Sequence, residues 1–236
     1  MTIPFQTGRY SVRFAACPAD VVACQRLRHM CFFDAPGRDK DPFDARCRHV
    51  MVHASMARLV ATMRLSAGPV TAGYAAQFYD VSALHALDVP MLEVGRFCIA
   101  PDVQDADVLR IAWGALTSYV DGLGVQILFG CASFAGSDPA LYGRVLARLA
   151  RYVGPHDLRP TPRVSTQPLA SVVPAGCAPL PALLRTYLAM GGWVGSDLII
   201  DPKMQTMHVF TCLEIAKIPA ARARSLRALA QEAALS

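Results

Sequence analysis

The sequence predicts a mixed α/β fold built on one mostly antiparallel sheet. A strand pattern followed by a helical pattern opens the chain, two alternating stretches in the first third predict a hairpin, and a strand, a helix and a strand fill residues 91–133. With 53% hydrophobic and 17% charged residues, the 236-residue chain can bury an ordered core. We therefore expect a single domain over residues 1–236, with a C-terminal extension from about residue 178.

The N-terminal elements are a strand, a helix and a hairpin. Residues 10–16 alternate as a strand does, and residues 19–33 carry apolar side chains at helical spacing, with Asp20 near the start. The polar stretch 34–47, punctuated by Pro and Gly, predicts a loop. Two alternating runs then predict the strands of the hairpin, residues 49–54 and 58–67.

Helices and strands continue through the rest of the chain. Pro139 favours a helix start, Gly191 and Gly192 favour a helix stop, and the Pro-, Thr- and Ser-rich stretch 153–181 predicts a long surface excursion. The predicted elements are, in order, a short helix near 81–86, a strand over 91–99, a helix over about 105–123, a strand over 125–133, helices over 137–152 and 181–190, strands over 193–200 and 206–215, and a helix over about 218–233.

Composition limits the classes of partner. Every apolar run is interrupted well before the roughly 18 residues that a membrane helix needs. The N-terminus lacks the basic start and apolar run of a signal peptide, so we expect a cytoplasmic protein. The net charge of +5 comes almost wholly from arginine. This excess suits an acidic partner or an anionic membrane surface, although codon bias explains it equally well, and we expect no nucleic-acid partner.

The cysteines and histidines do not predict a metal site. The 8 cysteines contain no C-x-x-C pair, and Cys17, Cys24 and Cys31 recur every seven residues, as small apolar side chains on one face of a helix do. Among the histidines only His49 and His53 have a suggestive spacing, and they lie on a predicted strand. We expect neither disulfides nor a bound metal.

Two charges interrupt the apolar strand LEVGRF. Burying an unpaired charge costs several kcal/mol, so Glu93 and Arg96 must be paired, near water or functional. Strict alternation places them on opposite faces of the strand unless a bulge intervenes, and Gly95 makes a bulge plausible.

Further charged residues in the first half of the chain could pair with Glu93 and Arg96. The D-P-F-D loop supplies Asp41 and Asp44, and the strand VATMRL carries Arg64. Simple ion pairing is the structural explanation for any one of these residues. The whole set is larger than a core requires, which favours a functional role.

Four segments resemble the acyl-carrier-protein-dependent branch of the GNAT acyltransferase fold: Q-R-L-R-H-M-C-F (25–32), D-P-F-D (41–44), A-T-M-R-L (61–65) and L-E-V-G-R-F (92–97). This branch includes the bacterial ornithine N-acyltransferases of ornithine lipid synthesis and the acyl-homoserine lactone synthases. The resemblance implies a GNAT-like acyl-CoA N-acyltransferase fold, with a mixed, mostly antiparallel central sheet flanked by helices. The positions of this chain that match the family's functional residues are Arg28, Phe32, Asp41, Asp44, Arg64, Glu93 and Arg96.

Downstream stretches separate the two families. I-L-F-G-C-A-S-F-A-G-S-D-P (127–139) and P-A-L-L-R-T-Y-L-A-M-G-G-W-V-G (181–195) resemble the ornithine acyltransferases, and the loop after Phe32 lacks the tryptophan usual in lactone synthases. Arg48 departs from the family pattern, because an acidic residue is expected there in many ornithine acyltransferases. The identity of the acceptor therefore stays open.

The resemblance implies transfer of a (3-hydroxy)fatty acyl group from acyl carrier protein to the α-amine of L-ornithine, giving a lyso-ornithine lipid. The phosphopantetheine thioester is then a co-substrate, and no other cofactor is expected. Peripheral contact with the inner face of the membrane stays open, and its candidate residues are equally well explained as a solvated basic face: Arg222, Arg224 and Arg227. Two alternatives remain, a lactone synthase that uses S-adenosylmethionine and a non-catalytic module that binds acyl chains or carrier protein.

Roles for the charged residues follow from this chemistry. Glu93, with Arg96 nearby, is the expected general base, directly or through a water. Asp41 and Asp44 are expected to bind the acceptor's ammonium groups. Arg28 or Arg64 is expected to bind its carboxylate, since a guanidinium fork matches a carboxylate bidentately, and Phe32 joins the substrate-binding set. Main-chain N–H groups are expected to meet the oxyanion at Phe97, Cys98 and Ile99.

The loop 101–107 bears on the acyl donor. It has no glycine and three acids, which would repel the phosphates of CoA, whereas N–H groups at the helix start near Asp105 could hold the one phosphate of a phosphopantetheine arm. A covalent route through Cys98 or Cys131 is disfavoured by their apolar strand contexts. An acyl groove is a further hypothesis, which core packing explains equally well; its residues would be Phe78, Tyr79 and Phe134.

Overall fold

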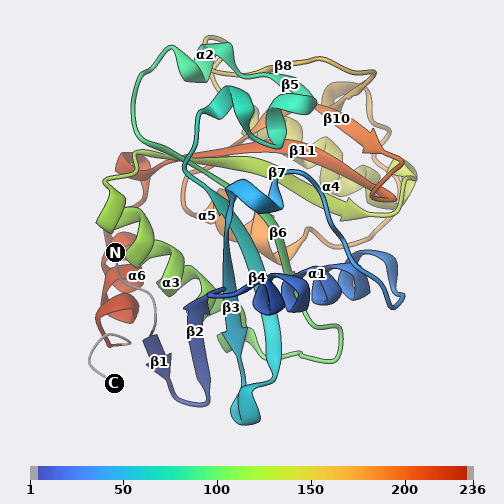
Figure 1. Cartoon of the computed structure of the whole chain (residues 1–236). Coiled ribbons are helices and arrows are strands. Elements are labelled where there is room, and N and C mark those ends of the chain that lie inside the picture. Colours follow the sequence, from blue (N-terminus) through green and yellow to red (C-terminus); the bar gives the residue numbers. More distant parts are fainter. Residues whose placement is uncertain (1–4, 233–236) are drawn as a thin grey trace. The chain divides into compact units, whose positions relative to one another are not determined.

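The computed structural model describes residues 5–232, and these form two compact units (Figure 1). The first unit holds residues 5–67, Val94–Val125 and 219–232, and the second holds Gly68–Glu93 and Gln126–Ile218. Strand β6 (Met91–Ile99) is divided between the two units. Its residues 91–93 belong to the second unit, and its other residues belong to the first. The extension predicted from about residue 178 lies mostly in the second unit.

The sheet of the first unit has the strand order β1-β2-β3-β4-β6. Its other strands are β1 (Phe5–Thr7), β2 (Tyr10–Phe14), β3 (Arg48–His53) and β4 (Leu59–Ser66). Each of β1 to β4 pairs antiparallel with the next. The strand predicted over 10–16 and the hairpin predicted over 49–67 are confirmed, while β1 was not predicted.

Three helices complete the first unit, with two short 3-10 turns: α1 (Pro18–Phe33), α3 (Ala106–Leu123), α6 (Ala220–Glu232), η1 (Asp44–Arg46) and η2 (Ser55–Ala57). Helix α1 packs on β3 and β4, and α3 lies beside α6 (Figure 1). The Asp20 carboxylate accepts the Ala16 N–H at 2.8 Å, and its ion pair with Arg13 holds the pKa of Asp20 well below the ordinary value. Within residues 5–232, no helix is long and apolar enough to cross a bilayer.

The sheet of the second unit is mixed. Its strands are ordered β6-β7-β11-β10-β9, with β7 (Ile127–Ala135), β9 (Gln167–Pro168), β10 (Trp193–Asp201) and β11 (Thr206–Glu214). Residues 91–93 of β6 run parallel to β7, and the other pairs are antiparallel. Strands β5 (Tyr79–Asp80) and β8 (Thr161–Pro162) form a separate pair.

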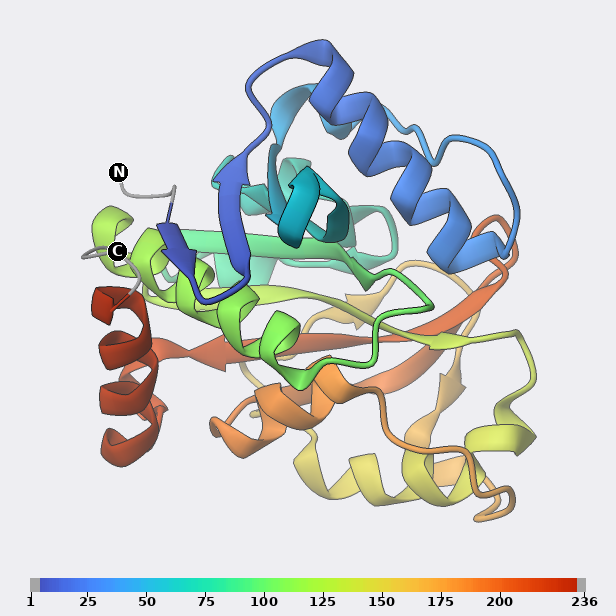
Figure 2. The same ribbon diagram turned by 90° about the horizontal axis from the view of Figure 1, so that it is seen from below.

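The faces of this sheet carry different elements. Along β11, Met207 and Val209 belong to one apolar cluster, whereas Phe210 and Cys212 belong to another, as alternation requires. On the Phe210 face lie η3 (Val70–Ala72), η4 (Ala75–Gln77) and α2 (Ser82–His85). On the Met207 face lie α4 (Gly143–Leu149), η6 (Ala150–Tyr152), η7 (Leu169–Ser171) and α5 (Ala182–Ala189), and Figure 2 shows α4 and α5 on the same side of the strands.

One predicted helix is wrong in its extent. Residues 137–152 form η5 (Pro139–Tyr142), α4 and η6 in place of one helix, because the excursion that follows packs against the junction. The Arg144 N–H donates to the Ala175 carbonyl at 2.8 Å, and a Cβ on Gly143 would lie 2.3 Å from the Val173 carbonyl oxygen. The helix stop at Gly191, with φ of 87°, is confirmed. A last turn, η8 (Ile215–Lys217), follows β11.

Candidate active site

Six charged side chains of the first unit form a closed ring of ion pairs. The guanidinium groups come from α1, β4 and β6, and the carboxylates come from the segment between α1 and β3. In ring order the members are Asp39, Arg28, Asp44, Arg64, Asp41 and Arg96. Each guanidinium bridges two carboxylates, so the ring is neutral as a whole.

The contacts around Asp44 show how closely the ring is joined. Arg28 Nε lies 2.9 Å from Asp39 Oδ2, and Arg28 Nη2 lies 2.9 Å from Asp44 Oδ1. Arg64 Nη1 lies 3.1 Å from Asp44 Oδ1 and 2.6 Å from Asp41 Oδ1. The loop is therefore fastened to α1 through one arginine and to β4 through another.

The ring is buried, and burial makes its pairing essential. The side chain of Arg28 is 1% exposed and that of Asp44 is 7%, whereas Asp41 is the most exposed member at 17%. Burial, the largest influence on Asp44, raises its pKa, but Arg28, Gln25 and Arg64 outweigh it together and leave the pKa below the ordinary value. Asp44 therefore stays ionised in the folded protein at neutral pH.

Strand β6 is irregular where it meets the ring. Arg96 has a φ of 52°, a left-handed conformation that is rare for a residue with a side chain. The irregularity lies at Arg96 and not at Gly95, where the sequence suggested a bulge. Arg96 Nε reaches Asp39 at 2.9 Å and Nη2 reaches Asp41 at 3.3 Å. These pairs explain the charge in this apolar strand, since Arg96 ties the loop to it.

Asp39 was missed by the sequence analysis. It pairs with both Arg28 and Arg96, and its main-chain carbonyl also accepts a hydrogen bond from Arg28. A balance of charges could have indicated it, because three buried arginines need three acids and D-P-F-D supplies only two. The nearest further acid in the loop is Asp39 itself.

Glu93 lies in the second unit and is 6% exposed. Its Oε1 accepts the Ala75 N–H at 2.6 Å, and its Oε2 accepts the Tyr74 N–H at 2.8 Å. The Tyr74 hydroxyl lies 3.1 Å from Asp201 Oδ2 on β10. Two main-chain donors therefore fix the Glu93 carboxylate, and the segment that supplies them is itself tied to the sheet.

A glycine makes room for this carboxylate. A Cβ on Gly73 would lie 2.3 Å from Glu93 Oε2. Gly73 has ordinary extended dihedral angles, so the need for glycine is one of space and not of backbone conformation. The position of the Glu93 carboxylate thus depends on a residue twenty positions earlier in the chain.

Phe97, Cys98 and Ile99 end β6. The Ile99 carbonyl accepts a hydrogen bond from the Cys31 thiol, with a distance of 3.3 Å between Sγ and the oxygen. A hydrogen bond with Cys31 and burial raise the pKa of the Cys98 thiol well above its ordinary value. A thiolate at Cys98 is thus disfavoured, which weighs against covalent catalysis there. Cys131 is half-buried on β7.

The start of α3 carries its own anion. The Asp105 carboxylate accepts the Asp107 N–H at 2.9 Å and the Tyr10 hydroxyl at 2.6 Å, and it pairs with Arg9. The Tyr10 hydroxyl, the Asp107 N–H and Arg9 lower the pKa of Asp105 to about 2. A phosphate at this helix start, as the sequence predicted, would compete with the Asp105 carboxylate for the Asp107 N–H.

The remaining predicted residues are scattered. Phe32 is half-buried on α1, and Arg48 is exposed with its guanidinium carbon 4.1 Å from the centre of the Phe14 ring. The hypothesis of one acyl groove lined by Phe78, Tyr79 and Phe134 is wrong. The first two pack in the Phe210 cluster, whereas Phe134 packs in the Met207 cluster on the other face of the sheet.

Comparison with known proteins decides the family. The chain is 30% identical to the L-ornithine N(alpha)-acyltransferase of Rhodobacter capsulatus, over 87% of this chain and 90% of that protein. The chain belongs to the L-ornithine N(alpha)-acyltransferase family. It is 28% identical to the Brucella abortus protein of the same name, over 89% and 86% of the two chains.

The fold agrees with this family assignment. Residues 23–114 match the model of the acetyltransferase (GNAT) domain. The structure is similar to that of FeeM, an N-acyl amino acid synthase from uncultured soil microbes, with a TM-score of 0.55, 12% identity, and coverage of 98% of this chain and 99% of that chain. The predicted GNAT-like fold and the predicted resemblance to ornithine acyltransferases are confirmed. The chain is an acyltransferase.

Proposed function

We propose that this chain transfers a fatty acyl group, with or without a 3-hydroxyl, from acyl carrier protein to the α-amine of L-ornithine, giving a lyso-ornithine lipid. The observation that supports this most strongly is the family, whose members carry ornithine acylation in their names. The reaction needs an amine, a thioester and a base. It requires neither a metal nor a redox cofactor.

Glu93 is our candidate for the base. An amino acid amine is mostly protonated at neutral pH and must lose a proton before it attacks. Glu93 takes that proton, directly or through a water molecule. The amine nitrogen then bonds to the thioester carbonyl carbon, and the C–S bond breaks. The departing thiolate takes the second amine proton, and Glu93 releases the first to solvent.

Main-chain N–H groups are our candidates for oxyanion stabilisation. The left-handed Arg96 interrupts the regular pleat of β6 directly before Phe97, Cys98 and Ile99. An interruption of this kind re-aims main-chain groups away from the ladder. N–H groups that are fixed before the reaction stabilise a developing oxyanion without reorganisation.

The acidic side of the ring is our candidate for acceptor binding. Ornithine carries a second ammonium group, and Asp41 is the ring carboxylate that water reaches best. Arg28 and Arg64 are 1% and 3% exposed and engaged with ring carboxylates. We therefore assign Arg64 to holding Asp41 directly, and Arg28 to holding Asp44, which Arg64 also contacts. Direct binding of the acceptor's carboxylate by Arg28 or Arg64, and a contact with Phe32, stay predictions.

The start of α3 supports a carrier-protein donor. Asp102, Asp105 and Asp107 are paired with Arg58, Arg9 and Arg110, so these arginines compensate the repulsion of phosphates that the three acids alone would cause. The Asp105 cap uses one N–H of the turn, which leaves fewer main-chain donors for the diphosphate of CoA. A phosphopantetheine arm brings one phosphate and relies on the carrier protein for much of its binding.

We expect Gly73→Ala to lower kcat about 10- to 100-fold while the protein stays folded. The added methyl pushes the Glu93 carboxylate from its two N–H donors, and a shift of about 1 Å in a catalytic group can cost on the order of 100-fold in rate. Single-turnover kinetics measures the rate of acyl transfer, and thermal melting shows whether the protein stays folded. The matched control is Gly122→Ala on α3, where a Cβ meets nothing within 4 Å. If both variants keep full activity, the position of the carboxylate does not matter for the reaction.

The product identifies the reaction. After incubation with a long-chain acyl carrier protein and L-ornithine, mass spectrometry should detect an N-acyl-ornithine, and the carrier protein should lose its acyl group in equal amount. Acyl-CoA in place of the carrier protein should react more slowly, because the Asp105 cap takes an N–H group at the start of α3 that would otherwise hold the CoA diphosphate.

Other outcomes select the alternatives. An acyl-homoserine lactone formed with S-adenosylmethionine, and no product with ornithine, would make the chain a lactone synthase. Binding of acyl carrier protein without turnover of either acceptor would support a non-catalytic module. Each of these outcomes would contradict the ornithine proposal.

We further propose that the protein works in the cytoplasm, at the inner face of the membrane, because the product is a single-chain lipid. Arg222 and Arg224 are exposed on α6 and are suitable contacts for anionic headgroups. Arg227 is less suitable, since its Nε lies 2.9 Å from Asp121 on α3. Loss of vesicle binding in the Arg222→Gln/Arg224→Gln variant would support this contact.

A further inference from the structure

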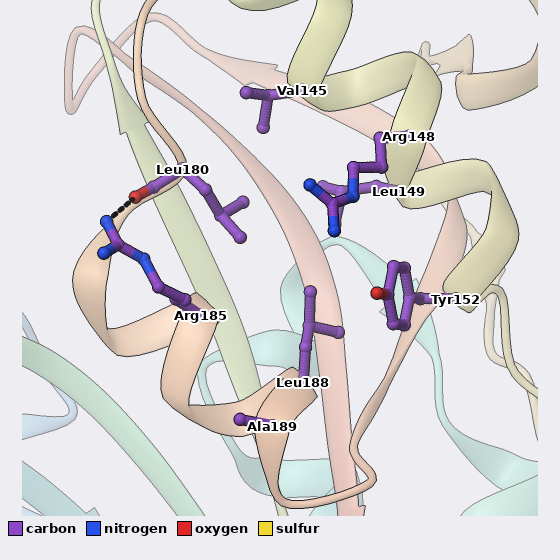
Figure 3. Close-up of a pocket in the computed structure, with 8 residues that line it drawn as sticks. All are labelled: Val145, Arg148, Leu149, Tyr152, Leu180, Arg185, Leu188 and Ala189. Atoms are coloured by element: carbon purple, nitrogen blue, oxygen red, sulfur yellow. Dashed lines mark hydrogen bonds between the residues drawn. The ribbon is translucent and has the colours of Figure 1, made fainter.

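A pocket of about 440 Å³ opens between α4 and α5 in the second unit (Figure 3). This volume lies in the range of roughly 300–1,000 Å³ that small-molecule sites occupy. Its apolar lining includes Leu149, Leu180 and Leu188, and two arginines border it, Arg148 from α4 and Arg185 from α5. The pocket thus combines a hydrocarbon surface with two cations.

The polar groups border the pocket on two sides. Figure 3 shows the Arg148 guanidinium and the Tyr152 hydroxyl pointing into the space from one side, whereas Arg185 lies on the other side with its guanidinium turned toward the Leu180 carbonyl. Arg185 Nη2 donates to the Leu180 carbonyl at 3.2 Å, which leaves its other N–H groups for a ligand or water. Both arginines are exposed, so a ligand can reach them from solvent. Planar guanidinium groups suit a carboxylate, which they can bind bidentately.

The surrounding charge favours an anion. The residues that line the pocket include two arginines and no acid, so the lining carries a net positive charge. Such a field attracts an anionic ligand and repels a cationic one.

The pocket is separate from the Glu93 carboxylate. Glu93 is paired in register with Phe129 on β7, and neighbours in register point to the same face of a sheet. Phe129 and Ala75 belong to the Phe210 cluster, whereas Leu149 belongs to the Met207 cluster on the opposite face. The sheet of the second unit therefore lies between the two sites.

We propose that this pocket binds a single-chain amphiphile with a carboxylate head, a fatty acid or an N-acyl amino acid. Its carboxylate binds Arg148 beside the Tyr152 hydroxyl, its chain lies over Leu149 and Leu188, and Arg185 adds a second positive charge at the opposite rim. The apolar lining excludes a small free anion as the best ligand, and the two cations exclude a fatty amine. The inference does not depend on the acceptor proposed above.

Photo-crosslinking tests the site directly. A twelve-carbon fatty acid with a diazirine in its chain is bound to the full-length protein, irradiated, and the labelled peptides are identified by mass spectrometry. We expect the label on α4 and α5. Arg148→Gln/Arg185→Gln should reduce labelling about tenfold or more, because the charge-assisted hydrogen bonds of Arg148 and the positive charge of Arg185 are both lost. The control, Arg26→Gln/Arg58→Gln, removes the same charge from two exposed positions of the first unit and should label as the wild type does.

Competition distinguishes the two sources of ligand. Unlabelled laurate should reduce labelling if the pocket binds fatty acids, and N-lauroyl-ornithine should reduce it if the pocket binds N-acyl amino acids. The stronger competitor is the preferred ligand. Dodecylamine should not compete. Label confined to peptides outside α4 and α5, or equal labelling in the two double variants, would overturn the proposal. The acyl-transfer assay contains no laurate, so it tests the ornithine reaction independently of the pocket. Absence of labelling contradicts only the pocket proposal, and absence of N-acyl-ornithine contradicts only the ornithine proposal.

Discussion

Glu93→Gln should lower kcat by a factor of about 10² to 10⁴, the range that general base catalysis contributes. The amide has nearly the same size and shape as the carboxylate, but it cannot take a proton from an ammonium group. Binding of the acyl carrier protein should change little, since the substituted atoms lie on a buried strand. The expected signature is a loss in kcat with a nearly unchanged KM for the donor.

The contacts of Glu93 predict how well the variant folds. In the wild type, both oxygens accept main-chain N–H groups, from Ala75 and Tyr74. In the Gln variant only one of these acceptors remains, and the amide NH₂ faces an N–H donor. A buried unsatisfied donor costs about 1–3 kcal/mol, so the variant should melt at a lower temperature but remain folded.

A second variant separates lost basicity from lost stability. Glu93→Asp keeps a carboxylate but shortens its reach, so it should keep part of the activity at neutral pH, whereas Glu93→Gln should gain activity only as rising pH leaves more of the amine unprotonated. Near-normal turnover in folded Glu93→Gln protein would remove Glu93 as the base. The main-chain groups that hold it would then have a purely structural role.

Much of the fold was predictable because its signals are local. Helix α1 and the hairpin of β3 and β4 follow from side-chain periodicity within each segment. The single helix predicted over 137–152 fails because the Ala175 carbonyl, more than twenty residues beyond the helix start, engages the Arg144 N–H. Periodicity within a segment carries no information about such a contact.

Some features of the candidate site were likewise predictable from local sequence signals, and others were not. The charged residues could be identified because Arg64, Glu93 and Arg96 are out of place in apolar strands. Their partners were harder to predict. Asp39 looks like an ordinary loop acid, and the donors to Glu93 are main-chain N–H groups, which any residue could supply. The left-handed conformation of Arg96 is likewise rare for a residue with a side chain, so the residue type gives no sign of it.

Arg28→Ala should reduce the free energy of unfolding by about 3–5 kcal/mol, because it leaves buried carboxylates without compensation. Arg28 is 1% exposed and contacts both Asp39 and Asp44, which are 6% and 7% exposed. Thermal melting measures the loss. The control is Arg58→Ala, which breaks the exposed pair with Asp102, whose side chains are 54% and 63% exposed, and should cost about 0–1 kcal/mol.

A second substitution tests whether charge balance is the cause. Arg28→Ala/Asp44→Asn leaves two arginines and two aspartates in the ring, so the buried charge is again neutral. The double variant should be more stable than the sum of the two single losses predicts, by about 0.5–3 kcal/mol. Strict additivity would mean that Arg28 acts through packing alone.

The pH dependence of the ring gives an independent check. The pKa of Asp44 is lower in the folded protein than its ordinary value of 3.8, so its contribution to stability is complete above that value and is lost as the pH falls through the folded pKa. Arg28 is one of the groups that lower this pKa, and its removal should raise it. The Arg28→Ala protein should therefore lose less stability to acid through Asp44 than the wild type does, and that loss should be complete at a higher pH. An identical acid transition in both proteins would show that Arg28 does not hold Asp44 in its charged form.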